Sequence, residues 1–124
     1  MKTKIFYIFA LTVMLVLVSG VAWTAPAAPS EVWVDDGWTD QTDVNNFNPV
    51  LSWQVDAFNT LQDGIDAVEQ GGTVNVTAGT YVQTGDLVID KTLTVIGTSG
   101  DGKPTIQFDG MCDSLIIQAD GVVV

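Results

Sequence analysis

The stretch that decides the fold is GGTVNV at residues 71–76, followed by LVIDKTLTVIG at residues 87–97. Both place apolar residues at alternate positions and are bounded by glycine or polar residues, which predicts short, half-buried strands. The Gly-Thr-Tyr sequence at residues 79–81 is predicted to turn the chain between them. The same reasoning along the whole chain predicts strands at residues 31–35, 73–76, 87–89, 93–96, 105–108, 115–117 and 122–124.

The spacing of these strands indicates that they stack in parallel. Apolar pairs recur at similar intervals in two interleaved series: Val74/Val76, Leu93/Val95 and Leu115/Ile117 in one, and Leu87/Ile89 with Ile106/Phe108 in the other. A repeat of about 20 residues without intervening helices suits a solenoid. We therefore predict an all-β fold over residues 73–124, the first coils of a right-handed single-stranded parallel β-helix. An antiparallel meander or sandwich is the alternative, because two Asp-Gly pairs could close hairpins.

One amphipathic helix is predicted before the strands, over residues 58–72, from apolar residues at helical spacing. Asn59 or Thr60 can cap its N-terminus, and the glycine pair at its end can supply a left-handed cap. Gly64 in its middle costs about 1 kcal/mol in helix propensity, so we expect another segment to pack closely there. The helix is expected to cover the first coil through six structural residues: Phe58, Leu61, Ile65, Val68, Gly71 and Gly72.

The rest of the chain divides into a leader and a linker. Two lysines precede an apolar run at residues 5–18, and Ala25-Pro26-Ala27 offers a cleavage motif, so residues 1–27 are predicted to be a secretory signal peptide. The run is shorter than the roughly 20 residues that span a bilayer, which makes an uncleaved anchor the weaker alternative. Residues 28–57 are predicted to form a strand and an extended cap loop. Because no cap follows the last strand, we expect the chain to be part of a longer β-helix.

Charge and composition exclude several classes of function. Without the leader, two lysines oppose 15 acidic residues, a formal charge of −13. Nucleic acid and anionic lipid are therefore unsuitable partners. The chain has no histidine, and its four basic residues are all lysines, so histidine triads, histidine metal sites and arginine clamps are excluded. Cys112 is the only cysteine and is expected to be buried as a small apolar side chain.

Several segments together resemble the N-terminal region of secreted pectin-lyase-like right-handed β-helix repeat proteins, over residues 32–117. The segments that carry the resemblance are VWVDD with Trp38, AF followed by TLQDGIDAV, GGTVNV, GTY and IDKTLTVIG. The resemblance implies an extracellular or cell-surface β-helix in a group that includes polysaccharide lyases, glycoside hydrolases and carbohydrate-binding surface proteins. It implies no catalytic residue in this segment, because the reactive residues of those enzymes lie on later coils.

Acidic residues provide the candidate metal ligands. Asp35, Asp36 and Asp40 form the densest cluster, and closely spaced carboxylates suit calcium. They lack the spacing of a known calcium loop, and aspartate is a common turn former, which favours a structural role. No other cofactor is predicted. Lys91 and Lys103 are expected to be solvated.

Aromatic residues provide the candidate ligand contacts. Trp33, Trp38, Trp53 and Tyr81 could stack on sugar rings, although a cap loop also needs bulky anchors, and anchoring is the favoured role. The Asn75-Val76-Thr77 sequence matches a glycosylation motif, but it lies in a predicted strand beside the core.

We predict a non-catalytic, secreted or cell-surface segment that starts and seals a solenoid and contributes to polysaccharide or cell-surface glycan contacts. No membrane contact is expected after the leader is removed. The alternative is the N-terminal part of a polysaccharide lyase or glycoside hydrolase whose active site lies beyond Val124. Two carboxylates acting together could catalyse glycoside hydrolysis, but the sequence does not single out such a pair among the 15 acidic residues. An independent calcium-binding module is the third hypothesis.

Overall fold

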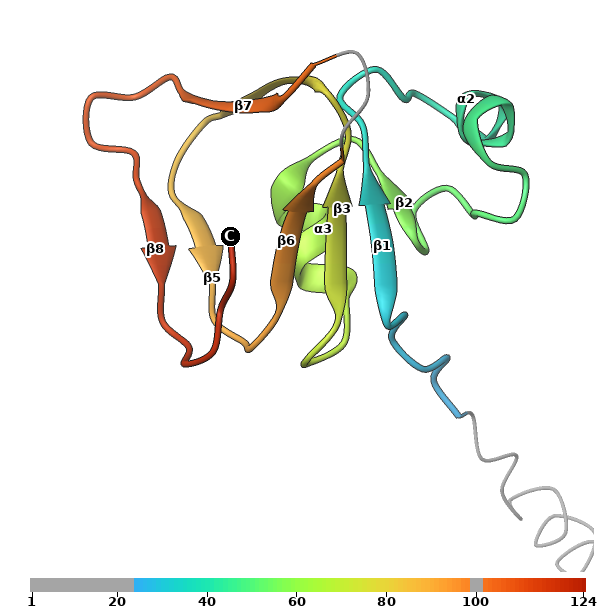
Figure 1. Ribbon diagram of the computed structural model, residues 1–124, viewed down its shortest axis with the longest axis horizontal. Coiled ribbons are helices and arrows are strands. Elements are labelled where there is room, and N and C mark those ends of the chain that lie inside the picture. Colours follow the sequence, from blue (N-terminus) through green and yellow to red (C-terminus); the bar gives the residue numbers. More distant parts are fainter. Residues whose placement is uncertain (1–23, 99–101) are drawn as a thin grey trace, which may run out of the picture.

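The computed structural model describes residues 24–98 and 102–124 (Figure 1). The signal peptide predicted at residues 1–27 falls mainly outside these ranges. Within them, no helix has the length and apolar character needed to cross a membrane. The elements in chain order are β1 (Glu31–Val34), α2 (Gln41–Phe47), β2 (Ala57–Phe58), α3 (Leu61–Ala67), β3 (Thr73–Val76), β4 (Gly79–Gln83), β5 (Leu87–Ile89), β6 (Thr94–Gly97), β7 (Pro104–Phe108) and β8 (Leu115–Ile117).

All pairs between these strands are parallel, which confirms the predicted direction of pairing and contradicts the antiparallel meander. One sheet has the order β2-β1-β3-β6, and two smaller sheets pair β4 with β7 and β5 with β8. The chain therefore passes along β3, β4 and β5 and then repeats this path as β6, β7 and β8, each strand beside its counterpart (Figure 1).

The predicted register is wrong. Val74 pairs with Val95 rather than with Leu93, and Leu87 pairs with Leu115 rather than with Ile106. Ile106 pairs instead with Tyr81. The Val74 partner is shifted by two residues, which keeps every side chain on the same face of a strand, so alternation cannot distinguish Leu93 from Val95. The Leu87 error differs, because Ile106 belongs to β7, which pairs with β4 in another sheet. The connections between strands differ in length, and the repeat therefore differs from sheet to sheet.

The largest differences in strand prediction concern β4 and the C-terminal residues. Residues 79–81, predicted as a turn, begin β4, whose Tyr81 and Gln83 are buried and whose whole length pairs with β7. The strand predicted at residues 122–124 is reduced to one isolated bridge, between Thr94 and Val123.

The predicted lid helix is present but shorter, because α3 covers only Leu61–Ala67. Thr60 caps its N-terminus by accepting a hydrogen bond from the Asp63 amide, at 3.2 Å. Phe58 belongs to β2 instead. Gly71 does take the left-handed conformation, with φ of 85°, but in a turn after the helix has already ended at its cap residue Val68.

The helix α3 lies over the core, as predicted. Leu61, Ile65 and Val68 are each 1 % exposed. A Cβ atom on Gly64 would come within 2.6 Å of a Val34 methyl group, which explains why glycine stands at this helix position. The main core consists of Val32, Val34, Phe58, Leu61, Ile65, Val68, Val74, Val76, Tyr81, Leu87, Ile89 and Leu93.

The helix α2 contradicts the prediction of an extended cap loop within residues 28–57. Asp40 caps it by accepting hydrogen bonds from the Thr42 and Asp43 amides. Val44 is fully buried in a second cluster with Trp38 and Ala57. The sequence of α2 shows little helical periodicity of apolar residues, so this helix depends on its N-terminal cap and on the burial of Val44.

Candidate functional site

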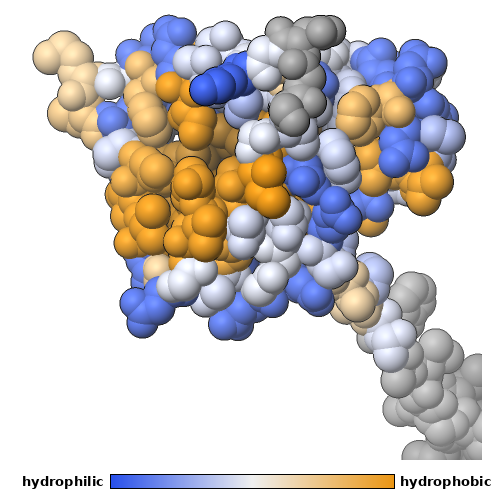
Figure 2. Space-filling view, viewed as in Figure 1, coloured by the Kyte–Doolittle hydropathy of each residue, from blue (hydrophilic) through white to orange (hydrophobic). Residues whose placement is uncertain are grey.

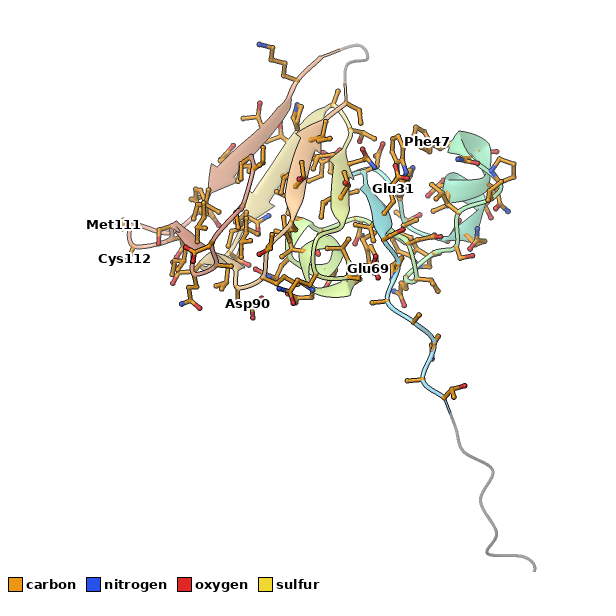
Figure 3. All side chains as sticks on the ribbon, turned by 60° about the horizontal axis from the view of Figure 1, so that its bottom comes forward. Glu31, Phe47, Glu69, Asp90, Met111 and Cys112 are labelled. Atoms are coloured by element: carbon orange, nitrogen blue, oxygen red, sulfur yellow. The ribbon has the colours of Figure 1, made fainter. Side chains whose placement is uncertain are left out.

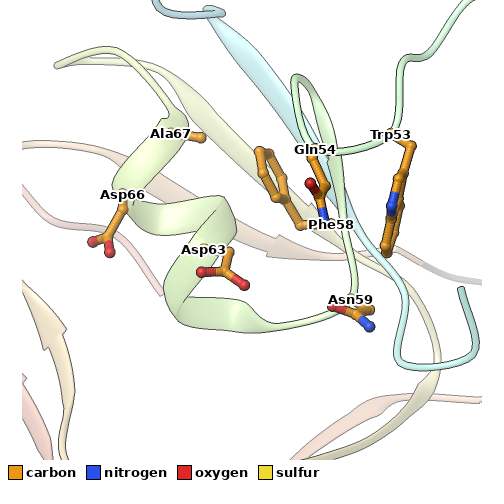
Figure 4. A pocket seen from close by; sticks show the side chains of 7 residues that line it. All are labelled: Trp53, Gln54, Phe58, Asn59, Asp63, Asp66 and Ala67. Atoms are coloured by element: carbon orange, nitrogen blue, oxygen red, sulfur yellow. The ribbon is translucent and has the colours of Figure 1, made fainter. Parts of the chain in front are cut away.

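An open pocket of about 520 Å³ lies between α3 and the segment that precedes it (Figure 4). Two aromatic rings and two carboxamides line one side, and α3 contributes the other. The lining residues are Trp53, Gln54, Phe58, Asn59, Asp63, Asp66 and Ala67.

The helix α2 positions the aromatic side of the pocket. The Trp53 amide donates a hydrogen bond to Gln41 Oε1 at 2.7 Å, and Gln41 Nε2 donates to the Leu51 carbonyl oxygen at 3.0 Å. A single side chain of α2 therefore holds both ends of the short segment that carries the indole ring.

A tight turn over residues 52–57 holds Trp53 and Gln54 in place. The Ser52 carbonyl oxygen accepts hydrogen bonds from the amides of Val55, Asp56 and Ala57 at 3.1–3.3 Å. The Ser52 amide donates to the Asp56 carboxylate at 2.6 Å. Gln54 has φ of 60°, a conformation that costs a side-chain-bearing residue about 1–2 kcal/mol. The surrounding hydrogen bonds impose this conformation, so the pocket wall is built before any ligand arrives.

The helix side of the pocket is acidic. Asp63 Oδ2 accepts a hydrogen bond from the Thr60 hydroxyl at 2.5 Å, and Asp66 Oδ1 accepts one from Gln62 Nε2 at 2.8 Å. Asp63 and Asp66 are exposed and three positions apart, so they share one helix face. Phe58, 9 % exposed, joins this side to the core.

The predicted calcium ligands do not form one cluster. Asp35 binds the Gly37 amide and the Thr77 hydroxyl, Asp36 binds the Thr80 amide, and Asp40 caps α2. Each carboxylate therefore has a structural role, in line with the favoured interpretation. Among residues 24–98 and 102–124, no group of three or more His, Cys, Asp or Glu side chains could hold a metal ion.

All four aromatic candidates take part in packing against the two core clusters. Tyr81 is 2 % exposed, and its hydroxyl group lies 3.0 Å from the carbonyl oxygens of Val34 and Thr77, which accept its hydrogen bond. Burial raises the pKa of this phenol above its usual value. Trp38 is buried, and Trp33 packs against it in the second cluster. Only Trp53 lines the pocket.

The two lysines differ. Lys103 is exposed, as predicted, but Lys91 is half-buried, and its Nζ donates to the Asp66 and Val68 carbonyl oxygens at 2.8 and 2.7 Å. The prediction that Lys91 is solvated is therefore wrong. Its positive charge lies at the C-terminal end of α3, where unpaired carbonyl groups and the helix dipole favour a cation.

Cys112 also contradicts its prediction, because it is exposed. It lies beside Met111 at the tip of the connection between β7 and β8 (Figure 3). Asn75 of the glycosylation motif is 7 % exposed and donates to Glu31 Oε1 at 2.7 Å, so the folded chain does not present it for modification.

No family model, curated protein or solved structure matches the chain. The candidate site therefore depends on the geometry of the pocket. Sequence reasoning weighed Trp53 as a ligand contact but missed Gln54, Asn59, Asp63 and Asp66 as its neighbours. The available signal was the Asn59–Asp66 segment, whose exposed polar residues lie just before α3 or on the exposed face of this helix.

Proposed function

We propose that this segment is the non-catalytic N-terminal cap and first coils of an exported right-handed parallel β-helix. Its role is to start and seal the solenoid and to present its surface to carbohydrate or other cell-surface ligands. The observation that carries the proposal is a difference between the two ends of the strand stack: one end is sealed, and the other exposes apolar side chains.

Polar side chains occupy the strand edges at the sealed end. Gln62 of α3 binds the backbone of β5 as a neighbouring strand would, because Val88 donates to Gln62 Oε1 at 2.9 Å and Gln62 Nε2 donates to the Val88 carbonyl oxygen at 3.0 Å. Asp36 accepts from the Thr80 amide of β4 at 3.1 Å. Unpaired strand edges promote association with other chains, and these contacts prevent it.

Apolar side chains gather at the other end of the stack. Figure 2 shows an apolar area on the side of the molecule where β5, β8 and the C-terminal residue lie in Figure 1. Leu115 and Ile117 of β8 are 39 % and 49 % exposed. Val123 already pairs with Thr94 of β6 by accepting from the Val95 amide at 2.8 Å and donating to the Leu93 carbonyl oxygen at 3.1 Å. This end is suited to receive a further parallel coil.

The topology supports the proposed handedness and class. Each return from one sheet to the same sheet is a parallel crossover, and such crossovers are right-handed in about 98 % of cases. The apolar run at residues 5–18 and the cleavage motif support export.

The sealing contact can be tested with a Gln62→Met variant, which keeps the length of the side chain but removes both hydrogen bonds to Val88. We expect faster hydrogen exchange at the Val88 amide and a loss of about 1–3 kcal/mol in the free energy of unfolding. Gln118→Met is the matched control, because Gln118 is exposed beside β8. Equal behaviour of the two variants would contradict the seal.

The absence of catalysis is tested separately. The protein without its leader should produce no new reducing ends or unsaturated products from pectate, alginate or xylan. Turnover above that of a buffer control would instead support a polysaccharide lyase or glycoside hydrolase.

A further inference from the structure

The pocket beside α3 has the chemistry of a cation site. Trp53 presents its indole ring at the pocket, whereas Phe58 lines it as a core residue that is 9 % exposed; Figure 4 shows both apart from the carboxylates of Asp63 and Asp66, which α3 contributes. The other lining residues are two carboxamides and one methyl side chain, so the lining carries negative charge and no positive charge.

This lining selects against an anionic ligand. The chain without its leader has a formal charge of −13, and both carboxylates at the pocket belong to exposed residues that stay in contact with water. An acidic sugar or phosphate would meet repulsion from Asp63, from Asp66 and from the protein as a whole. The ligand must therefore be neutral or cationic.

Three features favour a cation over a neutral ligand. Aromatic ring faces attract organic ammonium groups, and tryptophan does so best. The hydrogen bonds from Thr60 and Gln62 engage one oxygen of each carboxylate, Oδ2 of Asp63 and Oδ1 of Asp66, which leaves the second oxygen of each for a ligand. The turn around Gln54 fixes the aromatic wall in advance, so little ordering is needed on binding.

We propose that this pocket binds an organic ammonium group, such as the amine of an amino sugar, between the indole ring of Trp53 and the carboxylates of Asp63 and Asp66. Gln54 and Asn59 supply hydrogen bonds to polar groups beside the ammonium. The proposal does not require the solenoid, because every group that it uses precedes β3.

Three small molecules distinguish the contribution of the ammonium charge to binding from that of the sugar ring. Choline carries an ammonium group without a sugar ring, glucosamine carries both, and glucose carries only the ring. Titration of the protein without its leader would be followed by the NMR signal of the Trp53 indole N–H, which the Trp53→Leu variant assigns by its loss. Choline and glucosamine should shift the signal with millimolar dissociation constants, and glucose should not shift it at a tenfold higher concentration. Added salt should weaken binding, because the charges are exposed.

Matched variants identify the groups. Asp63→Asn combined with Asp66→Asn should weaken choline binding about fivefold or more, since it keeps the side-chain shapes but removes both charges. Glu69→Gln combined with Asp90→Asn removes two charges from exposed residues outside the pocket lining (Figure 3) and should change binding less than twofold. Trp53→Leu, followed by the shift of the Asn59 amide, should weaken binding about two- to fivefold.

Several results would overturn the proposal. Glucose binding as tightly as glucosamine would assign the pocket to neutral sugars, and equal effects of the two double variants would remove the role of the pocket carboxylates. Failure of choline and glucosamine to shift the signal would remove the site altogether. The sealing test is separate because its readout is exchange at the Val88 amide, which donates to Gln62 Oε1, whereas Gln62 reaches the pocket only through the hydrogen bond from its Nε2 to Asp66. Thermal melts of each variant would show that it is folded.

Discussion

Replacing Gly64 by alanine tests how closely the lid helix packs on the sheet. In an exposed helix, alanine is favoured over glycine by about 1 kcal/mol. Here the new Cβ atom would lie 2.6 Å from Val34 Cγ2, while its distances of 3.6 and 3.7 Å to Val74 and Val32 are ordinary contacts. The clash therefore involves one methyl group, on a side chain that is fully buried.

The magnitude follows from two opposing terms. Overpacking of a buried site costs about 1–3 kcal/mol, and Val34 is β-branched with little freedom to turn away. Subtracting the gain of about 1 kcal/mol in helix propensity leaves an expected loss of about 1 kcal/mol in the free energy of unfolding. In a domain of this size, such a loss lowers the melting temperature by about 4–8 °C.

A double-mutant cycle with Val34→Ala supplies the control. Val34→Ala alone should destabilise the protein by about 2 kcal/mol because it leaves a cavity. In that background the space beside Gly64 is open, so Gly64→Ala should stabilise by up to about 1 kcal/mol. The coupling between the two sites is then about 2 kcal/mol, measurable by urea unfolding followed by tryptophan fluorescence. Stabilisation by Gly64→Ala in both backgrounds would show that α3 does not pack on β1.

Three further predictions concern individual side chains. Lys91→Met removes two charge-assisted hydrogen bonds at the C-terminal end of α3 and should lower the free energy of unfolding by about 1.5–3 kcal/mol. The control variant Lys103→Met should change it by less than about 0.5 kcal/mol. Urea unfolding measures both values. Because burial raises the pKa of Tyr81, the stability that its neutral phenol contributes should be fully present below about pH 10 and lost as the pH rises through the folded-state pKa. Thermal melts as a function of pH should show this loss of stability in the native protein and a smaller loss in the Tyr81→Phe variant. That variant should itself be less stable at neutral pH by about 1–3 kcal/mol. Identical slopes of stability against pH above pH 10 in the two proteins would contradict the prediction. Cys112 should react with a thiol reagent as fast in the folded protein as in urea, and protection in the folded state would refute its exposure.

Local patterns were sufficient to predict much of the framework. The strands β3, β5 and β8 were predicted at their observed residues, because alternating apolar residues bounded by turns leave few other structures. The stripe of Leu61, Ile65 and Val68 predicted the buried face of α3. Gly64 predicted that another segment packs closely there, and the structure identifies that segment as β1. The approximate repeat also predicted parallel pairing.

The candidate site could not be predicted in the same way. Trp53 and Asp66 belong to different local structures, one in a turn and the other on α3, and α2 holds the Trp53 segment through Gln41. A seven-residue helix of this kind is marginal by itself and depends on the burial of Val44. Of the two buried partners of Val44, Trp38 is close to the helix in sequence, but Ala57 lies ten residues beyond its end.

The sequence by itself determined the alternation of the strands and the buried face of α3, because each depends on residues close together in the chain. It also indicated the parallel direction, because the strands recur at intervals of about 20 residues. Only the tertiary structure decided the register, the partner of Lys91, the exposure of Cys112 and the pocket beside α3. The physical reason is that strand alternation has a period of two, so that shifts of two residues are equivalent locally. Backbone pairing between coils, and the lengths of the connections between them, then select one arrangement and determine which side chains meet.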